Sequence, residues 1–283
     1  MGCMKTLALV LALASVGSAQ ALAPLSIASG GVTRTYRVYT PPKLQENRRL
    51  PLVFVLHGAG GTGEKLPATT HFNEIADKNG FIVVYPDGFE KHWNDLRGIP
   101  EWTAQAKNID DVGFFSALID RLIAENHVDS RRVFVTGISN GGLMSHRLGC
   151  ELSGKIAAIA PVVRTLTVRL SETCRPSRPV PALMFFGTAD KLVPFEGGEQ
   201  KMGSISTPVL SARQTIDRWA GLDGCGSAPA VENITSRAGQ RLSFSSCKQG
   251  SEVIGYILEG AGHSWPPGAA EIIWSFFNKH PTK

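Results

Sequence analysis

Short apolar runs alternate with helix-like stretches along almost the whole chain. Seven runs are candidate strands, at residues 32–39, 52–56, 81–85, 133–136, 156–162, 182–186 and 253–258. Apolar residues at helical spacing indicate five helices between and after them, at residues 72–78, 112–125, 141–151, 210–219 and 270–279. Strands that alternate with helices favour a mostly parallel, twisted sheet covered by helices on both faces. We therefore predict the α/β class and a single domain over residues 24–283.

The first residues, which precede that domain, have the pattern of a secretory signal. Lys5 precedes an almost wholly apolar stretch at residues 6–16, and small residues follow up to Ala21. The apolar stretch is too short to cross a membrane. We predict a signal peptide over residues 1–21, with cleavage between residues 19 and 23, and a secreted protein that is extracellular or periplasmic, with no membrane span.

Four cysteines follow the signal, and export would expose them to an oxidising compartment. An even number of cysteines in such a compartment indicates two disulfides. Four cysteines allow three pairings, and we favour the one that is local in sequence: Cys150 with Cys174 and Cys225 with Cys247. Their spacing does not resemble a zinc site, so we predict no metal.

The charge pattern argues against nucleic-acid binding. The formal net charge is +5, but the basic residues are scattered, without a dense Lys/Arg run or interleaved aromatic residues. A solvated surface explains this mild excess of positive charge. Nothing in the pattern decides the oligomeric state.

Residues 137–141 read Gly-Ile-Ser-Asn-Gly, directly after one candidate strand and before one candidate helix. This is the pattern of a nucleophile elbow, in which a serine on a sharp strand-to-helix turn is pushed out of the sheet. The flanking glycines are needed because side chains there would collide with the neighbouring strand and helix. Ser139 is therefore a candidate nucleophile.

A serine hydroxyl needs a base, normally a histidine that is oriented by a carboxylate. Asp190 comes directly after the strand at residues 182–186, and His263 lies in a Gly-rich loop after the strand at residues 253–258. Ligands bind at the carboxyl ends of the strands in such sheets, and the order Ser, Asp, His is the one this architecture uses. His280, at the end of the last helix, reads as a surface residue.

Acyl transfer also needs N–H donors for a developing oxyanion. We expect the backbone N–H of Asn140 to be one donor and that of Ala59 to be the second, with Gly60 as the alternative. The same loop, after the strand at residues 52–56, matches G-x-G-x-x-G and nearly matches a P-loop. Pro67 interrupts the helix that a dinucleotide site requires, and Glu64 stands where a P-loop needs lysine. We therefore predict no cofactor.

Six separately placed motifs now resemble a known family, the secreted polyhydroxybutyrate depolymerase/feruloyl esterase group of α/β-hydrolases, which includes acetylxylan esterases. They lie at residues 56–61, 93–95, 111–114, 137–142, 187–194 and 262–266, and cover nearly all of the mature chain. The resemblance implies an α/β-hydrolase fold, carboxylic-ester hydrolysis and a Ser139-Asp190-His263 triad. It also supports disulfides at the four cysteines.

The resemblance extends to residues around the triad. Trp265 and His57 are expected to contact the substrate, although a packing role for Trp265 is equally open. Trp93 and Asp111 read as structural or cleft-lining. Three departures bear on specificity: Ala59 stands where many relatives carry cysteine, residues 266–267 double a proline, and residues 161–164 put bulk where relatives commonly have small residues. We expect the surroundings of Arg164 and Trp265 to decide which ester is cleaved.

The sequence thus predicts a secreted serine esterase without a large lid. Its substrate would be an ester, possibly polymeric: feruloyl or acetyl esters of plant polysaccharides, or alternatively a short-chain polyester of the polyhydroxybutyrate type. A non-catalytic envelope binding protein on a hydrolase scaffold is the alternative from another class. A binding module has no need of a base beside a nucleophile.

Overall fold

The structure of the protein is a computed structural model that describes residues 22–42, 48–226, 228–234 and 238–282. The predicted signal peptide over residues 1–21 lies outside the described residues. The strands are β1 Leu25–Ser29, β2 Val32–Tyr39, β3 Leu50–Leu56, β4 Ile82–Pro86, β5 Val128–Ile138, β6 Ala158–Val162, β7 Ala182–Gly187, β8 Gly198–Met202, β9 Ile205–Val209, β10 Ala230–Asn233, β11 Gly239–Phe244 and β12 Val253–Leu258. The α-helices are α1 Leu66–Thr70, α2 Phe72–Asn79, α3 Thr103–Ala106, α4 Asp111–Glu125, α5 Asn140–Glu151, α6 Val168–Thr173, α7 Ala212–Leu222 and α8 Ala269–Phe277.

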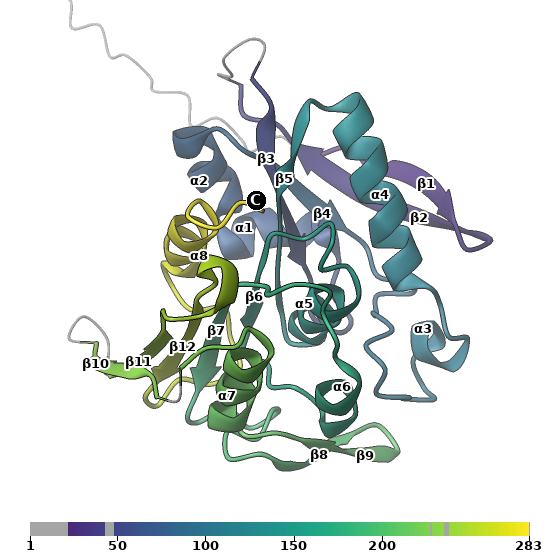
Figure 1. The fold of residues 1–283 in the computed structure, drawn as a ribbon. Coiled ribbons are helices and arrows are strands. Elements are labelled where there is room, and N and C mark those ends of the chain that lie inside the picture. The colour runs from purple at the N-terminus through teal and green to yellow at the C-terminus, as the bar shows by residue number, and fades with distance from the viewer. Residues whose placement is uncertain (1–21, 43–47, 227, 235–237, 283) are drawn as a thin grey trace, which may run out of the picture.

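One sheet runs through the molecule in the strand order β1-β2-β4-β3-β5-β6-β7-β12-β11-β10 (Figure 1). The central strands, from β4 to β12 in this order, are parallel, whereas the strands at both edges are antiparallel. Strands β8 and β9 form a separate hairpin beside α6 and α7. A mostly parallel sheet was predicted from the alternating runs, and the structure confirms it.

Strand β3 shows how the sheet is buried on both faces. Successive side chains of a strand point to opposite faces. Leu52, Phe54 and Leu56 accordingly join the apolar cluster that includes α4, α5 and α7, while Val53 and Val55 join the cluster that includes α1, α2 and α8. The continuous apolar run of β3 therefore reflects a strand that is covered by helices on both sides, as predicted.

The structure contains strands that the sequence pattern did not predict, namely β1, β8, β9, β10 and β11. All four side chains of β10 are exposed, and β8 buries only Gln200, so neither strand has an apolar run. Their pairing depends on a neighbouring strand in space, which local periodicity does not reveal. Helix α7 begins at Ala212, two residues later than predicted, because Ser211 caps it with a capping box.

The two disulfides join the pairs that are local in sequence. Cys150 at the end of α5 bonds to Cys174 after α6, and Cys225 bonds to Cys247. This is the pairing that we favoured. In the part of the chain that the structure describes, no helix has the length and apolar character needed to cross a membrane.

The parallel strands bring the predicted functional loops to one edge of the sheet. In register, Leu56 of β3 pairs with Gly137 of β5, and Leu258 of β12 pairs with Gly187 of β7. Strand β6 lies between β5 and β7, so the carboxyl ends of all five strands meet at this edge. The loops that carry the candidate functional residues leave the sheet there.

Candidate active site

Ser139 stands on the turn between β5 and α5 with φ 58° and ψ −114°. A positive φ is uncommon for a residue with a side chain and stores backbone strain, which surrounding contacts must hold in place. The two glycines of the turn make those contacts possible. A Cβ on Gly137 would lie 2.7 Å from the Cβ of Leu56, and one on Gly141 would lie 2.5 Å from the Leu56 carbonyl oxygen. The turn therefore packs on β3 so closely that only glycine fits at either position.

Asp190 and His263 are hydrogen-bonded to each other after the ends of β7 and β12. The distance from His263 Nδ1 to Asp190 Oδ2 is 2.7 Å, and both side chains are largely buried. The second carboxylate oxygen, Oδ1, accepts the backbone N–H groups of Leu192 and Val193. Because the carboxylate accepts at Nδ1, the ring presents Nε2 for proton transfer. The arrangement is that of a base oriented by an acid.

The charge of Asp190 is stabilised within this loop. Burial raises the pKa of the carboxyl, but the hydrogen bond from His263 and the N–H groups of Val193 and Leu192 outweigh burial and hold the pKa below its usual range. Asp190 is therefore ionised at neutral pH. An ionised acid can hold the imidazole in one tautomer and stabilise its protonated form.

The two backbone N–H groups predicted as oxyanion donors have no acceptor in the part of the chain that the structure describes. Asn140 is the first residue of α5, so its N–H has no acceptor within the helix. Ala59 lies in the loop after β3, and its N–H has no hydrogen-bond partner among the described residues. The N–H of Gly60, the alternative donor, is instead bonded to the carbonyl of Lys91 at 2.9 Å. The geometry thus favours Ala59 over Gly60.

The side chain of Asn140 anchors the elbow to residues 93–95, a role that the sequence pattern did not reveal. Its Oδ1 accepts the backbone N–H of Trp93 at 2.9 Å, and its Nδ2 donates to Asp95 Oδ2 at 2.5 Å. Asp95 is itself fully buried and paired with Arg97. The only signal in the sequence was that the motif at residues 93–95 occurs together with the elbow.

Asp111 contacts residues 93–95 from the start of α4 and helps to hold them in place. Its Oδ2 accepts the backbone N–H of Asn94 at 2.6 Å, and its Oδ1 lies 2.6 Å from a guanidinium nitrogen of Arg34. Both charged side chains are almost completely buried. Burial of such a pair requires that each charge meets its partner. Of the two roles that the sequence left open for Asp111, structural or cleft-lining, these contacts support the structural one.

The imidazole of His57 is built into the loop. It is 2% exposed, its Nδ1 lies 2.7 Å from the Gly58 carbonyl oxygen, and its Nε2 accepts the N–H of Gly88. Burial lowers the pKa of His57 to about 4, so the ring is neutral. A substrate contact was expected here, but the structure corrects this expectation, because neither ring nitrogen is left free for a ligand.

Known proteins resemble this chain over most of its length. The family model Esterase PHB depolymerase matches residues 34–165. A curated protein, the putative esterase NocK of Nocardia uniformis subsp. tsuyamanensis, is 32% identical over 84% of this chain and 72% of its own length. The chain belongs to the PHB depolymerase family of esterases. The predicted resemblance is thereby confirmed.

Further relatives of this esterase bear names that refer to plant-polymer esters. Feruloyl esterase B of Piromyces equi is 27% identical over 83% of this chain, which spans only 43% of that protein. The solved structure of an acetyl xylan esterase from Aspergillus awamori has a TM-score of 0.64 and 18% identity, and covers 90% of this chain and 99% of its own. At that identity the likeness establishes the fold alone, which is that of the α/β-hydrolase esterases, as predicted.

Trp265 lies two residues after His263 and is partly buried. Its ring packs edge-to-face on Phe72 of α2, with 6.2 Å between the ring centroids. A pocket of about 400 Å³ lies beside the same loop of the esterase. Its lining is mostly apolar and includes Val163, Leu258, Ala261, Pro266 and Pro267. Gly262 and Ser264, the neighbours of His263 in the chain, also line it. The doubled proline therefore forms part of a pocket wall next to the candidate base.

The surroundings of Arg164 were expected to help to select the ester, and the side chain of Arg164 itself is completely buried. It therefore cannot contact a substrate directly. Val163, in the same segment, nevertheless lines the pocket beside His263, so the expectation drawn from the bulk at residues 161–164 stays a prediction.

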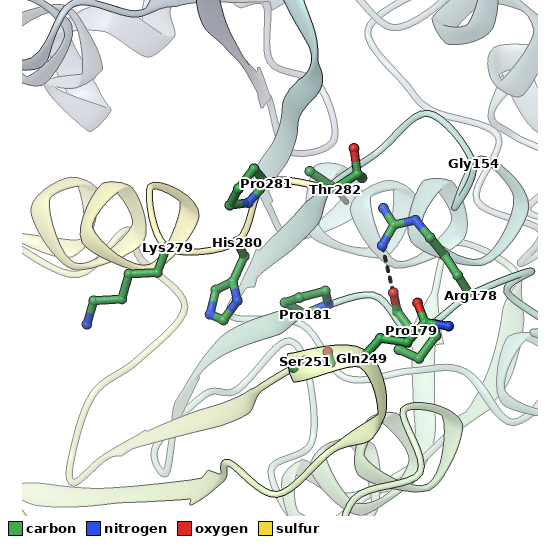
Figure 2. A pocket seen from close by; sticks show the side chains of 12 residues that line it. Gly154, Arg178, Pro179, Pro181, Gln249, Ser251, Lys279, His280, Pro281 and Thr282 are labelled. Carbon is green, nitrogen blue, oxygen red and sulfur yellow. Dashed lines mark hydrogen bonds between the residues drawn. The ribbon is translucent and has the colours of Figure 1, made fainter.

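A second pocket, of about 530 Å³, opens at the opposite edge of the sheet, where β6, β7 and β12 begin (Figure 2). Basic side chains line it, but two of them are already engaged. Arg178 donates to the carbonyls of Pro179 and Ile156, and His280 contacts Glu252 at 3.3 Å. The nucleophile and base candidates thus lie at the other edge, around Ser139.

Proposed function

We propose that this esterase hydrolyses carboxylic esters through an acyl-enzyme formed on Ser139. The observation that carries the proposal is the 2.7 Å contact between His263 and Asp190, at the same edge of the sheet as the strained turn of Ser139. A serine, a base and an orienting acid that follow strand ends in this order are the elements of a hydrolytic triad.

In the first half of the reaction, the Ser139 hydroxyl oxygen attacks the ester carbonyl carbon while His263 Nε2 takes the hydroxyl proton. The N–H groups of Asn140 and Ala59 hold the resulting oxyanion. The bond between the carbonyl carbon and the alcohol oxygen then breaks, and His263 donates its proton to the departing alcohol. Asp190 stabilises the imidazolium throughout.

In the second half, water attacks the carbonyl carbon of the acyl-enzyme and gives a proton to His263. The bond to Ser139 breaks, the serine oxygen regains that proton, and the carboxylic acid leaves. No step needs a metal or an organic cofactor. Water is consumed, and one acid and one alcohol are released in each cycle.

For the substrate we propose feruloyl or acetyl esters of plant polysaccharides. Two relatives are named for such esters, and the apolar pocket beside His263 offers space for an aromatic or short acyl group, with Trp265 at its loop. Short-chain polyesters are the second candidate, because the matching family model is described as a polyhydroxybutyrate depolymerase. Two disulfides support export of the protein from the cytoplasm.

The mechanism is tested with Ser139→Ala, assayed on a short aryl ester and with a fluorophosphonate label. We expect kcat/KM to fall by a factor on the order of 10⁶, with unchanged thermal unfolding and no adduct on the protein. Ser204→Ala is the matched control, because Ser204 is exposed and its polar contacts are with Glu101 and not with the triad. Wild-type turnover by Ser139→Ala would refute the assignment, and a wild type that neither turns over nor labels would favour a binding protein.

The substrate class is tested by kcat/KM on methyl ferulate, acetylated xylan, short aryl esters and amorphous polyhydroxybutyrate. We expect kcat/KM to be higher on methyl ferulate or on acetylated xylan than on amorphous polyhydroxybutyrate. Faster release of acid from the polyester than from both of them would favour the second candidate.

A further inference from the structure

Arg164 follows β6 and is buried against the helix that begins at the elbow. Its side chain is 0% exposed, and a Cβ on Gly142 of α5 would lie 2.9 Å from the Arg164 Cβ. Its carbonyl oxygen lies 3.4 Å from Nε2 of His146, also in α5. Burial lowers the pKa of Arg164 to about 9, which still leaves it charged at neutral pH. A charge buried at this cost needs fixed partners.

Among the described residues, one side chain accepts a hydrogen bond from this guanidinium. Nη1 donates to Oε1 of Gln200 at 2.7 Å, whereas Nε and Nη2 have no hydrogen-bond partner among the described residues. Gln200 is 1% exposed and belongs to β8, in the hairpin that is separate from the main sheet. The other end of its amide, Nε2, donates to the carbonyl of Leu192 at 2.8 Å.

Leu192 belongs to the turn that presents Asp190. Its backbone N–H donates to Asp190 Oδ1 at 2.8 Å, while Asp190 Oδ2 contacts His263. The Leu192 side chain itself contributes little packing, because it is 56% exposed. Two hydrogen bonds hold the backbone of this turn: the Leu192 N–H donates to the Asp190 carboxylate, and the Leu192 carbonyl accepts from Gln200. The buried Arg164 cation and the Asp190 carboxylate also attract each other.

We propose that Arg164 and Gln200 are positioning residues that hold the Asp190 turn so that its carboxylate meets His263. The chain of contacts runs from the elbow helix through Arg164, Gln200 and the Leu192 peptide to Asp190. It links the helix that begins directly after the nucleophile to the loop that carries the acid. The inference rests on the proposed role of Asp190, and it gives the β8–β9 hairpin a function in catalysis.

The first test is Gln200→Met, which keeps the approximate volume and the neutral charge but removes both hydrogen bonds. We expect kcat on a short aryl ester to fall about 10- to 100-fold, because small displacements of an orienting group have effects of this size. KM should change less than about threefold, because the substitution leaves the substrate-binding groups in place. The acid limb of the kcat/KM–pH profile should move to lower pH, because a displaced Asp190 stabilises the protonated base less.

Lys201→Met is the matched control. Lys201 follows Gln200 in β8, its side chain is exposed, and it makes no bond to the Asp190 turn. Its kcat and pH profile should equal those of the wild type. If Gln200→Met unfolds at assay temperature, Gln200→Glu replaces it, because a carboxylate still accepts from Arg164 but cannot donate to Leu192. Arg164→Lys should retain more kcat than Arg164→Met, since it keeps the charge and one donor.

A double-mutant cycle with Asp190→Asn separates positioning from a general structural effect. If Gln200 acts through Asp190, Gln200→Met should change kcat/KM less than twofold in the Asp190→Asn background, roughly within additivity error for uncoupled sites. An equal loss in both backgrounds, or wild-type kinetics for Gln200→Met, would overturn the inference while leaving the triad intact. Asp190→Asn alone tests the triad, and wild-type activity in that variant would refute the acid role and the inference together.

Discussion

The indole Nε1 of Trp93 donates a hydrogen bond to the carbonyl oxygen of His57 at 2.9 Å. The backbone N–H of the same Trp93 donates to the Asn140 side chain. One fully buried residue therefore contacts both segments that carry the proposed oxyanion donors, the loop after β3 and the start of α5. We therefore expect Trp93 to fix the separation of the two proposed donors.

Trp93→Phe should lower kcat more than it alters KM. The phenyl ring leaves the His57 carbonyl without its donor and leaves part of the indole volume empty, so the loop can shift. We expect a destabilisation of about 2–4 kcal/mol and a loss in kcat of about 10-fold or more. Urea unfolding and steady-state kinetics measure the two effects. Trp102→Phe, a partly exposed tryptophan stacked on His92, is the control and should keep full kcat.

Gly141→Ala tests the close packing of the elbow. An added Cβ would lie 2.5 Å from the Leu56 carbonyl oxygen and 2.6 Å from that of His57. Since both atoms belong to the backbone of β3 and its loop, we expect a loss of about 1–3 kcal/mol or more in stability and a large loss of esterase activity. Gly221→Ala in α7 is the control. Nothing lies within 4 Å of its added Cβ, and the change should stabilise the helix by about 0.4–1 kcal/mol.

Two buried histidines should make the fold sensitive to mild acid. Burial lowers the pKa of His146 to about 3 and that of His57 to about 4. Between pH 6.5 and pH 4 the unfolded chain binds protons at these positions and the folded chain does not, so stability is full above pH 6.5 and falls as the pH falls. At pH 4 each histidine lowers the free energy of unfolding by roughly 3 kcal/mol relative to its value above pH 6.5.

His146→Gln should remove about half of that pH dependence. A glutamine amide can accept from the Trp219 indole and donate to the Arg164 carbonyl, the two contacts that His146 makes, without titrating. Urea unfolding at pH 7, 6, 5 and 4 measures the slope for both proteins. Identical slopes would contradict the assignment of acid sensitivity to this histidine.

Asp223 should act in the opposite direction. Burial raises its pKa to about 6, and it accepts from Val180 N–H and the Ser251 hydroxyl. The folded chain therefore holds a proton that the unfolded chain loses. Its stabilising contribution is complete below about pH 4 and is lost as the pH rises through about 6.

Asp223→Asn should gain stability relative to the wild type as the pH rises. The difference between the two unfolding free energies should grow by roughly 2–3 kcal/mol between pH 4 and pH 7. The same urea series measures it. Asp217→Asn, an exposed carboxylate on α7, is the control and should track the wild type. A difference that is constant with pH would show that Asp223 does not titrate in this range.

The sequence located the candidate reacting groups because their positions follow from local patterns. Each central strand is a short apolar run, and in a parallel sheet the residue after such a run lies at the functional edge. Ser139, Asp190 and His263 could therefore be placed at that edge before any contact was known. The disulfide pairs were also local in sequence, and the structure contains both.

The roles of His57, Arg164 and Asn140 could not be inferred in the same way. A histidine in a glycine-rich loop suggested contact with a ligand, and the surroundings of an arginine after a strand suggested a specificity pocket, yet the structure buries both side chains. The partners that decide this, Gly88 for His57 and Gln200 for Arg164, lie more than 30 residues away along the chain. Local periodicity reports which face of an element is apolar, and it carries no information about such distant polar contacts.

The sequence by itself determined the class of fold, the order of the candidate nucleophile, acid and base, and the edge of the sheet at which they lie. Each of these depends on hydrophobic periodicity and on the fixed geometry of strand and helix. The tertiary structure alone decided how the site is braced: Trp93 between the oxyanion segments, and Gln200 between Arg164 and the Asp190 turn. Those contacts join segments that become neighbours only after the chain packs, because a buried polar group bonds whatever partner the packing brings within reach.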